Sequence, residues 1–359
     1  MADTWRLIDT GLRPAGQNIA LNRALLEARQ AEEAPSTLRF LRFAPCALLG
    51  YHQSAEQELN LDYCRANRIT IQRRITGGGA IYFDENQLGW ELYLHRRDVG
   101  TGDMQAIARR ICHAAAAAVS ALGVDARYRP RNDIEVGGRK ISGTGGAFDG
   151  DALLYQGTLL VELDVEKMLR VLRIPAEKLS DKAIASARER VASLTELLGR
   201  KPDVGLIKRY LTEAFESEFD VEFRDGDLTL TEHRRFEAAA AEIEHADWIN
   251  LVTRPRSDMP LLEGAQKFPG GLLRAALTFD TRARAIRSVW FSGDIFVTPR
   301  RTVADLEAAL KDTPLERLEA RVHGFFAGRE VDMLSLAPGD FVNVVRLALK
   351  EPVVGSVTR

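Results

Sequence analysis

The sequence has few cysteines and no excess of charge of either sign. Cys46, Cys64 and Cys112 are the three cysteines among 359 residues, and no two of them form a C-x-x-C spacing. An odd, widely spaced set of this kind argues against a disulfide framework and against a structural zinc site. Lysine and arginine number 49 against 51 aspartates and glutamates, which gives a net charge of −2. This balance does not support a broad surface for nucleic acid or membrane, although a local basic groove stays open.

Long apolar runs are also missing. Residues 1–6 contain no hydrophobic stretch of the kind that a signal peptide needs. The alanine run 114–118 is too short to cross a bilayer and follows Arg109, Arg110 and His113, so we interpret it as part of a buried helix. We predict a cytoplasmic, monomeric protein that has no nucleic-acid or membrane partner.

The length and the element pattern predict two domains. A chain of 359 residues with 45% hydrophobic and 28% charged residues exceeds the usual size of one globular domain. Apolar residues at helical spacing predict helices over 16–33, 105–122, 165–172, 188–198, 203–218 and 232–244. Strand-like runs cover 37–43, 47–51, 69–74, 80–83, 88–94 and 153–163.

The composition changes after the helix over 232–244. Residues 254–260 are the most loop-like stretch of the chain, and we place a domain boundary near residue 247. Beyond it, a strand pair over 271–279 and 285–291 precedes helices over 302–311 and 314–326. We therefore predict an α/β (α+β) fold, with a large mixed sheet flanked by helices over 1–246 and a small α/β domain over 247–359.

The first of two glycine-bearing segments is RRITGGGAIY, residues 73–82. Three successive glycines cost backbone entropy, so a chain keeps them where positive φ or close backbone approach is required. A tight turn between strands explains the glycines equally well, but Arg73 and Arg74 add guanidinium groups that suit a carboxylate or phosphate. No G-K-[ST] follows and no helix begins directly after the glycines, so the P-loop and the dinucleotide fingerprint are excluded.

The second segment is RNDIEVGGRKISG, residues 131–143, which predicts a hairpin with a glycine turn. Asn132 and Asp133 stand at the entrance of the hairpin, and Lys140 follows its turn. Most lysines are solvated surface residues, but a lysine here can neutralise a carboxylate or phosphoryl group as charge builds up. A flexible SGTGG loop over 142–146 follows directly. The pattern indicates an anion cradle built from two sides.

Taken in order, these motifs resemble the lipoate–protein ligase family, in the superfamily that also holds biotin ligases and octanoyltransferases. The QGTLL stretch at 156–160 is similar to the family's H-G-T-L-L segment, and the spaced residues Lys182, Ser186, Arg190, Val191 and Leu194 resemble its K-x-x-x-S-x-x-x-R-V-x-x-L stretch. Trp248-Ile249 and GDIF at 293–296 resemble the accessory C-terminal domain of the long bacterial ligases. The resemblance covers nearly the whole chain. It implies a biotin/lipoate-ligase-like fold, with a catalytic domain over 1–246 and an accessory domain over 247–359.

The resemblance implies a two-step, ATP-dependent reaction. The carboxylate of lipoate or octanoate attacks the α-phosphate of ATP, with Mg²⁺, and the acyl adenylate then acylates a lysine of a small lipoyl-acceptor protein. The implied acceptor is a glycine-cleavage H-protein-like protein, a 2-oxoacid dehydrogenase lipoyl domain or a dedicated lipoate-binding protein. Ile75, Ile81 and Leu160 would line an acyl tunnel, in which each buried methylene contributes about 0.8 kcal/mol.

The same resemblance assigns roles to residues of this chain. Lys140 would hold the carboxylate and α-phosphate oxygens together and is the expected catalytic residue, and Asp133 is the expected metal ligand. The expected substrate and adenylate ligands are Arg74, Thr76, Gly77, Gly78, Gly79, Ala80, Tyr82, Asn132, Asp133, Ser142, Gly143, Gly157 and Thr158.

The chain departs from the family pattern at three places. Phe83 and Gln156 stand where many members have histidine, and DENQ at 84–87 replaces the usual D-x-G-N. Asparagine tolerates positive φ better than most residues, so we expect Asn86 to take over the turn position of that glycine. These departures concern the adenylate contacts and the acceptor more than the reaction type.

Two other functions stay open beside the ligase. An octanoyltransferase would pass the acyl group through a cysteine thioester without ATP, but residues 125–133, where such relatives place that cysteine, contain none. We interpret Cys46 and Cys112 as small buried hydrophobes. A non-catalytic module that binds lipoyl groups or acyl adenylates has less need of Lys140. A biotin ligase would require an arginine- and glycine-alternating loop that the chain lacks. We favour the ligase.

Overall fold

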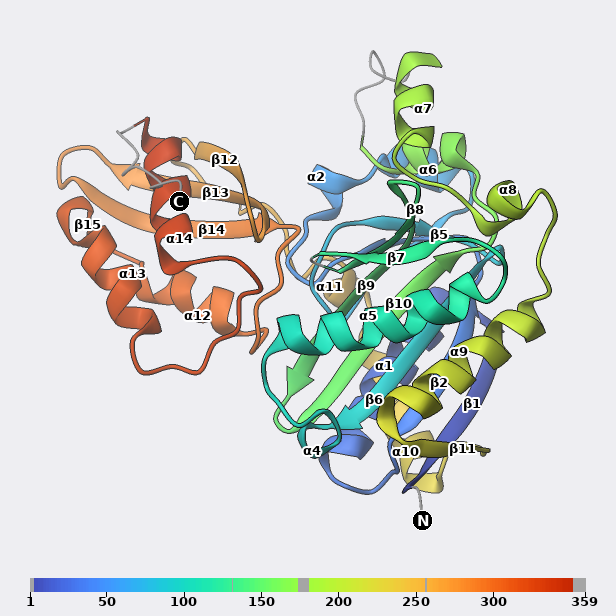
Figure 1. Ribbon diagram of the computed structural model, residues 1–359. Helices are drawn as coiled ribbons and strands as arrows, with labels where there is room; N and C mark the ends of the chain where they lie inside the picture. The colour runs from blue at the N-terminus through green and yellow to red at the C-terminus, as the bar shows by residue number, and fades with distance from the viewer. Residues whose placement is uncertain (1–2, 131, 174–180, 256, 351–359) are drawn as a thin grey trace. The chain divides into compact units, whose positions relative to one another are not determined.

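The computed structural model describes residues 3–130, 132–173, 181–255 and 257–350 (Figure 1). The chain divides into two compact units: unit 1 comprises 1–49, 58–76 and 80–249, and unit 2 comprises 50–57, 77–79 and 250–359. The two short pieces of unit 2 interrupt unit 1 in the sequence, so the division is not a single cut. The functional division into 1–246 and 247–359 stays a prediction. Arg131, at the start of the second glycine segment, lies outside the described residues.

Within the described part of unit 1, the central element is an eight-stranded sheet. Its order is β11 (Val221–Asp225), β1 (Asp3–Arg13), β2 (Thr37–Phe43), β6 (Gln87–His95), β10 (Ala152–Leu160), β9 (Arg139–Asp149), β8 (Asp133–Val136) and β7 (Ala126–Arg129). Strand β1 pairs in parallel with β2 and β11, and the other neighbours pair antiparallel. The predicted mixed sheet is confirmed.

Helices cover both faces of this sheet (Figure 1). Helices α5 (Met104–Ser120) and α9 (Val204–Phe219) bury apolar side chains against a core that contains Trp90 and Tyr155. Helices α1 (Ala15–Gln30) and α10 (Leu230–Ile243) contact each other, and α1 lies against the opposite face of β6 and β10. Because side chains of a strand alternate between faces, Trp90 points to α5 and α9 while its neighbour Glu91 meets α1.

The α1 side of the sheet encloses a group of polar residues that we call the Arg39–Glu91 cluster: Asn18, Asn22, Arg39, Glu91 and Tyr93. Arg39 is 0% exposed and Glu91 is 3% exposed. Arg39 Nη1 donates to Glu91 Oε2 at 3.0 Å, the Tyr93 hydroxyl donates to the same oxygen at 2.6 Å, and Asn22 donates to Oε1 at 2.7 Å. Asn18 Oδ1 accepts from Arg39 Nη2. The buried charges are therefore hydrogen-bonded within the cluster.

A small three-stranded sheet of β4 (Thr70–Arg73), β3 (Cys46–Leu49) and β5 (Ile81–Phe83) adds a second layer to unit 1, within the described ranges. The part of unit 1 that the structure describes also contains six short helices: α3 (Leu61–Ala66), α4 (Arg96–Val99), α6 (Val165–Val171), α7 (Asp181–Arg188), α8 (Leu194–Leu198) and α11 (Ala246–Ile249). Strands β1, β7 and β11 were not predicted from the sequence pattern.

The predicted helix over 188–198 is wrong over residues 189–193, whereas its last five residues are helical. Helix α7 ends at Arg188, and α8 begins at Leu194 behind a Ser193 cap. Between them the chain pairs in parallel with β9, because Lys140 N–H donates to Arg190 O at 2.8 Å and Ala192 N–H donates to Lys140 O at 2.9 Å. Main-chain pairing with β9 thus replaces the helical bonds that the local pattern predicts.

Unit 2 has its own sheet and core. Its described strands are β12 (Leu262–Phe268), β13 (Gly271–Asp280), β14 (Ala285–Gly293) and β15 (Thr313–Pro314), in that order. The helices α12 (Thr302–Ala309), α13 (Leu318–Phe326) and α14 (Pro338–Leu349) bury residues such as Leu306 and Phe341 against this sheet. Residues 55–57 of the short helix α2 (Ala55–Glu58) lie in one of the inserted pieces. The predicted strand pair and the helix near 302–311 are confirmed, and the helix near 314–326 begins with a 3₁₀ turn.

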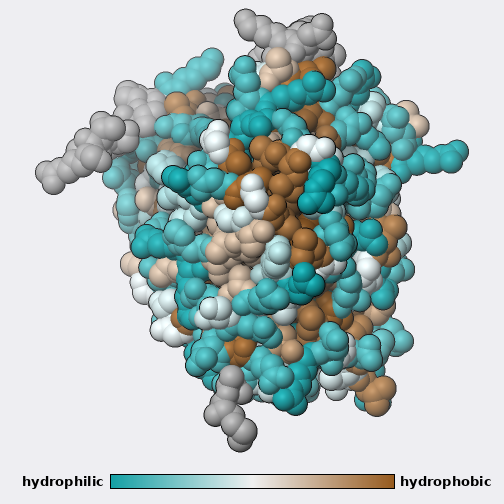
Figure 2. All heavy atoms as spheres, turned by 45° about the vertical axis from the view of Figure 1, so that its right-hand side comes forward, coloured by the Kyte–Doolittle hydropathy of each residue, from teal (hydrophilic) through white to brown (hydrophobic). Residues whose placement is uncertain are grey.

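The surface of the chain mixes polar and apolar side chains. Figure 2 shows a band of apolar side chains, in brown, between hydrophilic ones. Partly buried residues such as Leu122, Val124 and Leu197 pack against the core of unit 1. Exposed apolar area of this kind is normal for globular proteins. Among the described residues, no helix combines the length and the hydrophobicity that crossing a bilayer requires.

Candidate active site

The predicted lysine hairpin is formed by β8 and β9. Gly137 and Gly138 make its turn with φ of 57° and 80°, a left-handed conformation that glycine adopts without a steric penalty. Lys140 follows this turn and pairs with Glu135 across the hairpin. Its main chain is held from the other side by residues 190–192. The position of the Lys140 backbone is therefore fixed by pairing on both edges of β9.

Lys140 and Asp133 form an ion pair at the root of the hairpin. Lys140 Nζ lies 2.7 Å from Asp133 Oδ1, and the two side chains are 36% and 20% exposed. A Cβ atom on Gly143 would lie 2.7 Å from Lys140 Nζ and 2.9 Å from its Cε. The glycine thus leaves the space in which the lysine side chain lies. The structure brings together three predicted site residues: Lys140, Asp133 and Gly143.

The carboxylate of Asp133 contacts two cations. Oδ1 meets Lys140, and Oδ2 accepts a hydrogen bond from Arg129 Nη2 at 2.7 Å. Arg129 Nη1 also contacts Glu135 Oε2 at 2.9 Å. Among the described residues, no group of three histidine, cysteine or acidic side chains could hold a metal ion. With both oxygens engaged by cations, Asp133 does not fit the metal role that the resemblance implies, and we assign no residue to Mg²⁺.

Asn132 is tied to Thr144 on β9 by three hydrogen bonds. The Asn132 side-chain amide donates to Thr144 O, and Asn132 O accepts from Thr144 N–H at 2.8 Å and from Thr144 Oγ1 at 2.9 Å. One side-chain amide proton of Asn132 is therefore used within the protein. The three bonds hold Asn132, the residue before Asp133, against β9.

Two predicted ligands face the core instead of a ligand-accessible surface. Ser142 is fully buried and pairs with Ile134 and Leu159, both core residues, and its hydroxyl has no hydrogen-bond partner among the described residues. A Cβ atom on Gly157 would lie 2.2 Å from the indole of Trp90. Packing explains both residue types. We therefore carry no substrate role for Ser142 or Gly157 forward.

The opposite face of β10 carries Gln156 and Thr158. Gln156 Nε2 donates to Thr76 Oγ1 at 2.9 Å, and Thr158 Oγ1 donates to Gly143 O at 3.3 Å. Thr76 is buried and directly precedes the three glycines. Gln156, at a position where the family often has histidine, thus attaches the start of the glycine run to the main sheet.

The two arginines before the glycines have different surroundings. Arg74 is buried and donates to Leu48 O at 3.0 Å, and burial lowers its pKa to about 10, so it stays charged at neutral pH. Arg73 is fully buried. It donates to the carbonyls of Trp248 and Ile249, at the C-terminal end of helix α11. The role of Arg74 as an anion ligand stays a prediction.

Residues 80–87 connect the glycine run to β6. Tyr82 is buried on β5, where Lys167 Nζ lies 5.3 Å from its ring centroid, and burial together with the charge of Asp84 raises the pKa of the tyrosine. Ala80 is partly buried just before β5. Phe83 packs on Phe43 with ring centroids 4.6 Å apart. It is a buried core residue.

The turn at 84–87 differs from the prediction. Asn86 does not adopt positive φ. Asp84 Oδ1 accepts from Asn86 N–H at 2.9 Å, and Gln87 Oε1 accepts from Asp84 N–H at 2.6 Å. Side-chain bonds of Asp84 and Gln87 therefore close the turn, and no left-handed residue is required.

Gly77, Gly78 and Gly79 belong to unit 2. Gly78 has a φ of 92°, and its N–H donates to Ile295 O at 3.1 Å. A Cβ atom on Gly77 would lie 2.2 Å from Ile295 O, whereas one on Gly79 would find ordinary contact at 3.7 Å from Asp294. Positive φ and close backbone approach both occur, as the glycines predict. The approaching group in this structure is the main chain of residues 295 and 296.

None of the three cysteines is placed as an exposed nucleophile. Cys46, Cys64 and Cys112 are all buried. Burial raises the pKa of each thiol, and most strongly that of Cys46. A neutral, buried thiol is a poor nucleophile because the thiolate is the reactive form.

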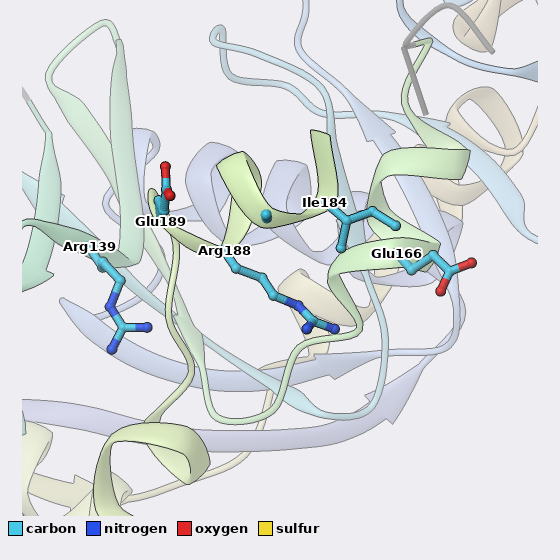
Figure 3. Close-up of a pocket in the computed structure, with 6 residues that line it drawn as sticks. Arg139, Glu166, Ile184, Arg188 and Glu189 are labelled. Atoms are coloured by element: carbon cyan, nitrogen blue, oxygen red, sulfur yellow. The ribbon is translucent and has the colours of Figure 1, made fainter. Parts of the chain in front are cut away.

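A polar hollow of about 670 Å³ lies beside the start of β9 (Figure 3). Its lining combines two arginines, two glutamates and two apolar residues: Arg139, Glu166, Ile184, Ala185, Arg188 and Glu189. Figure 3 shows Ile184 and Arg188 projecting from α7 toward Glu166. Since the charges of the lining balance, the hollow does not specify a ligand.

The sequence pattern does not reveal several residues around Lys140. Arg129, Thr144 and the segment 190–192 contact the hairpin residues directly. Thr144 lies in the SGTGG stretch, which forms part of strand β9 and not the predicted flexible loop. It could have been selected as a small polar residue next to a glycine. Arg129 gives no such signal, because an arginine on a strand is usually solvated.

Comparisons with known proteins agree with these features. The family model of the lipoyl protein ligase A/B catalytic domain matches residues 14–216, more than half of the chain. The octanoyltransferase LipM of Moorella thermoacetica is 28% identical over 268 residues, covering 69% of this chain and 98% of the relative.

Two solved structures share the fold. A structure from work on a bipartite lipoate protein ligase and its E2 lipoyl domain from Thermoplasma acidophilum has a TM-score of 0.63 and 28% identity, over 72% of this chain and all of the other. A lipoate–protein ligase A bound with ATP has a TM-score of 0.60 and 27% identity, over 69% of this chain and 98% of the other. The chain belongs to the lipoyl protein ligase A/B family, within the biotin/lipoate ligase superfamily.

Proposed function

We propose that this chain is an ATP-dependent lipoate–protein ligase, which activates lipoate or octanoate as an acyl adenylate and transfers the acyl group to a lysine of a small lipoyl-acceptor protein. The observation that carries the proposal is the Lys140–Asp133 pair. Lys140 Nζ is held by one carboxylate oxygen at 2.7 Å, and its side chain stays 36% exposed. An ammonium group has three donors. Among the described residues, Lys140 Nζ forms its ion pair with Asp133, so donors remain for a ligand.

In the first step, a carboxylate oxygen of the fatty acid attacks the α-phosphorus of ATP, and the bond to the pyrophosphate oxygen breaks. Negative charge builds up on the α-phosphate oxygens during this displacement. Lys140 Nζ would donate to one of these oxygens and to the attacking carboxylate, which a positioned cation stabilises most in the transition state. Gly143 would keep the lysine side chain in place, since any larger residue would meet Nζ.

In the second step, the ε-amine of the acceptor lysine attacks the acyl carbonyl carbon. The bond from that carbon to the AMP oxygen breaks, and AMP and one proton leave with the amide formed. Arg74, Thr76 and Ala80 remain proposed adenylate ligands. Gly78 N–H donates to Ile295 O in this structure, so it would have to exchange that acceptor for a phosphate oxygen.

Two comparisons support the use of ATP and of a lipoyl acceptor. One related structure is a lipoate–protein ligase A bound with ATP, and another comes from work on a ligase and its E2 lipoyl domain. The absence of an exposed cysteine supports a ligase over a thioester-forming transferase, because all three thiols are buried. We place the protein in the cytoplasm, without a nucleic-acid or membrane partner, as the sequence predicts.

The second candidate is an octanoyltransferase that does not use ATP. The relative named octanoyltransferase LipM matches this chain over 98% of its own length, which favours this alternative. It would require a thiolate or another nucleophile to carry the acyl group.

The deciding experiment offers the chain an acceptor lipoyl domain with different acyl donors and measures the acceptor mass. We expect a lipoyl or octanoyl increment with free acid, ATP and MgCl₂, and none when ATP is omitted. A mass increment from octanoyl acyl-carrier protein in the absence of ATP would instead establish the transferase. An unmodified acceptor with both donors would contradict both functions.

A further inference from the structure

We infer that Tyr155, Thr144 and Cys112 form a buried hydrogen-bonded relay that positions the Asn132–Asp133 turn, and through it Lys140, for the reaction. The inference rests on the proposed role of Lys140. The three residues are positioning residues because they come from the core and act through the turn.

The relay joins three elements in the core of unit 1. Cys112 lies on α5, Thr144 on β9 and Tyr155 on β10, and all three side chains are buried. Tyr155 OH lies 2.7 Å from Thr144 Oγ1. Cys112 Sγ lies 3.3 Å from Thr144 Oγ1 and 3.4 Å from Tyr155 OH. The polar atoms of the three side chains thus form a closed group.

Counting protons gives the relay a direction. Thr144 has one hydroxyl proton, and it donates that proton to Asn132 O at 2.9 Å. Tyr155 must therefore be the donor in the bond between the two hydroxyls. The Cys112 thiol then donates to one of these two oxygens. Burial raises the pKa of the thiol and of the Tyr155 hydroxyl, so both groups stay protonated. The relay ends on the Asn132 carbonyl.

The turn that the relay holds is the one that carries the partner of Lys140. Asn132 O also accepts from Thr144 N–H, and the Asn132 side chain donates back to Thr144 O. The next residue is Asp133, whose Oδ1 lies 2.7 Å from Lys140 Nζ. A shift of Asn132 relative to β9 would therefore move the carboxylate that orients the lysine.

Core filling alone does not explain these side chains. Phenylalanine and valine would occupy the space of Tyr155 and Thr144 without bringing hydroxyl groups into the interior. Burying a hydroxyl is unfavourable unless it is hydrogen-bonded, and here the bonds converge on one main-chain carbonyl. Hydrogen bonds in a dry interior also polarise one another, which stiffens the group that they hold.

The test compares Thr144→Val, Thr144→Ser and Tyr155→Phe in the full chain. We expect Thr144→Val to lower kcat for lipoate-dependent ATP–pyrophosphate exchange about tenfold, with the dissociation constant for lipoate unchanged. Thr144→Ser should restore the wild-type kcat because it keeps the hydroxyl. Tyr155→Phe should lower kcat about threefold, because it leaves the bond to Asn132 intact.

Equal kcat values for Thr144→Val and the wild type would overturn the inference, as would a serine variant as slow as the valine variant. Loss of lipoate binding in parallel with kcat would indicate a merely structural role. If Thr144→Val does not fold, the kcat of Tyr155→Phe decides, and a wild-type value then overturns the relay.

A ligand-free measurement separates this inference from the proposed function. Hydrogen–deuterium exchange of peptides that cover 126–146 should be faster in Thr144→Val than in Thr144→Ser, because the Thr144 amide is bonded to Asn132 O. If the wild type transfers octanoyl without ATP, the proposed ligase fails, and the same variants are compared by their transfer rates. Unchanged exchange in Thr144→Val would overturn the relay under either function.

Discussion

Two ion pairs on the same face of the large sheet of unit 1 show how differently the same chemistry is used. Arg39 and Glu91 are buried with side chains 0% and 5% exposed, whereas Lys140 and Asp133 are 36% and 20% exposed. In the Arg39–Glu91 cluster, both carboxylate oxygens of Glu91 accept hydrogen bonds from buried neighbours. Lys140 keeps donors that no described residue uses. The first pair is saturated and holds α1 to the sheet, and the second retains capacity for a ligand.

The difference teaches which buried charges to regard as functional. A charge that is removed from water needs a complete set of partners, so its presence reflects the demands of folding. A charge that is half-exposed and partly satisfied can exchange water for a substrate oxygen. By this criterion Lys140 is a candidate for chemistry, whereas Arg39 and Arg73 are structural.

Removing one member of the saturated pair should have the largest effect on stability. We expect Glu91→Ala to lower the free energy of unfolding by about 3–5 kcal/mol, because it leaves the Arg39 charge buried without its partner. Urea unfolding of the full chain measures this value. The control is Glu222→Ala, which removes an exposed partner of Arg224 and should cost less than about 1 kcal/mol. A Glu91 effect as small as the control would remove the distinction between the two pairs.

Glu307 extends the comparison to a half-buried carboxylate that meets no cation among the described residues. It accepts Phe291 N–H at 2.7 Å, and burial raises its pKa from 4.5 to about 7. The stability that its neutral form contributes is complete below pH 4.5 and is lost as the pH rises through about 7. We expect unit 2 to lose at most about 3 kcal/mol from this group over that range.

Hydrogen exchange of β14 peptides between pH 4.5 and 8, corrected for intrinsic rates, measures this effect. Glu307→Gln should abolish the pH dependence. The matched control Glu319→Gln, at an exposed ion pair with Arg346, should leave it unchanged. A pH dependence that persists in Glu307→Gln would contradict the assignment.

Gly143→Ala tests whether the space for Lys140 matters. The new Cβ would lie 2.7 Å from Lys140 Nζ, at the end of a flexible side chain that can move away. We therefore expect stability within about 1 kcal/mol of the wild type and a fall in ATP–pyrophosphate exchange of about tenfold. Wild-type exchange in this variant would mean that the observed lysine position is not needed.

Gln156→Leu should have the smallest effect. It removes one hydrogen bond to Thr76, and one neutral hydrogen bond contributes about 1 kcal/mol. We expect KM for ATP to rise about threefold to fivefold, measured by pyrophosphate exchange, while kcat stays unchanged. Gln156→His, which introduces the residue common in the family, should stay near the wild-type KM. A larger KM for the histidine variant than for leucine would show that the bond to Thr76 is not the relevant contact.

The strongly periodic elements of this fold could be predicted from the sequence, and the long-range pairings could not. Helices α5 and α9 and the lysine hairpin follow from local spacing and from the glycines at 137 and 138. Residues 190–192 look helical by themselves but pair with Lys140, a contact that local pattern does not report. The same limit applies to Ser142 and Gly157, because motif position does not tell which face of a strand meets the core.

In the candidate site, too, local contacts could be predicted and long-range contacts could not. Lys140, Asp133 and Gly143 come together because one hairpin connects them, so sequence neighbours become spatial neighbours. Tyr155 and Cys112 contact Thr144 from two separate elements and belong to no sequence motif. The contacts of Asp133 also differ from those that the resemblance implies. Arg129 and Lys140 both contact its carboxylate, which the resemblance assigns to a metal.

Lipoate-dependent exchange of pyrophosphate into ATP tests the central claim most directly, because it reports adenylate formation without an acceptor. The account predicts exchange with the wild type, a loss of about 10²–10³-fold in Lys140→Ala and no loss in Lys208→Ala, which removes another lysine paired with an aspartate, Asp9. Exchange at the wild-type rate in Lys140→Ala, with the variant folded, would contradict the account.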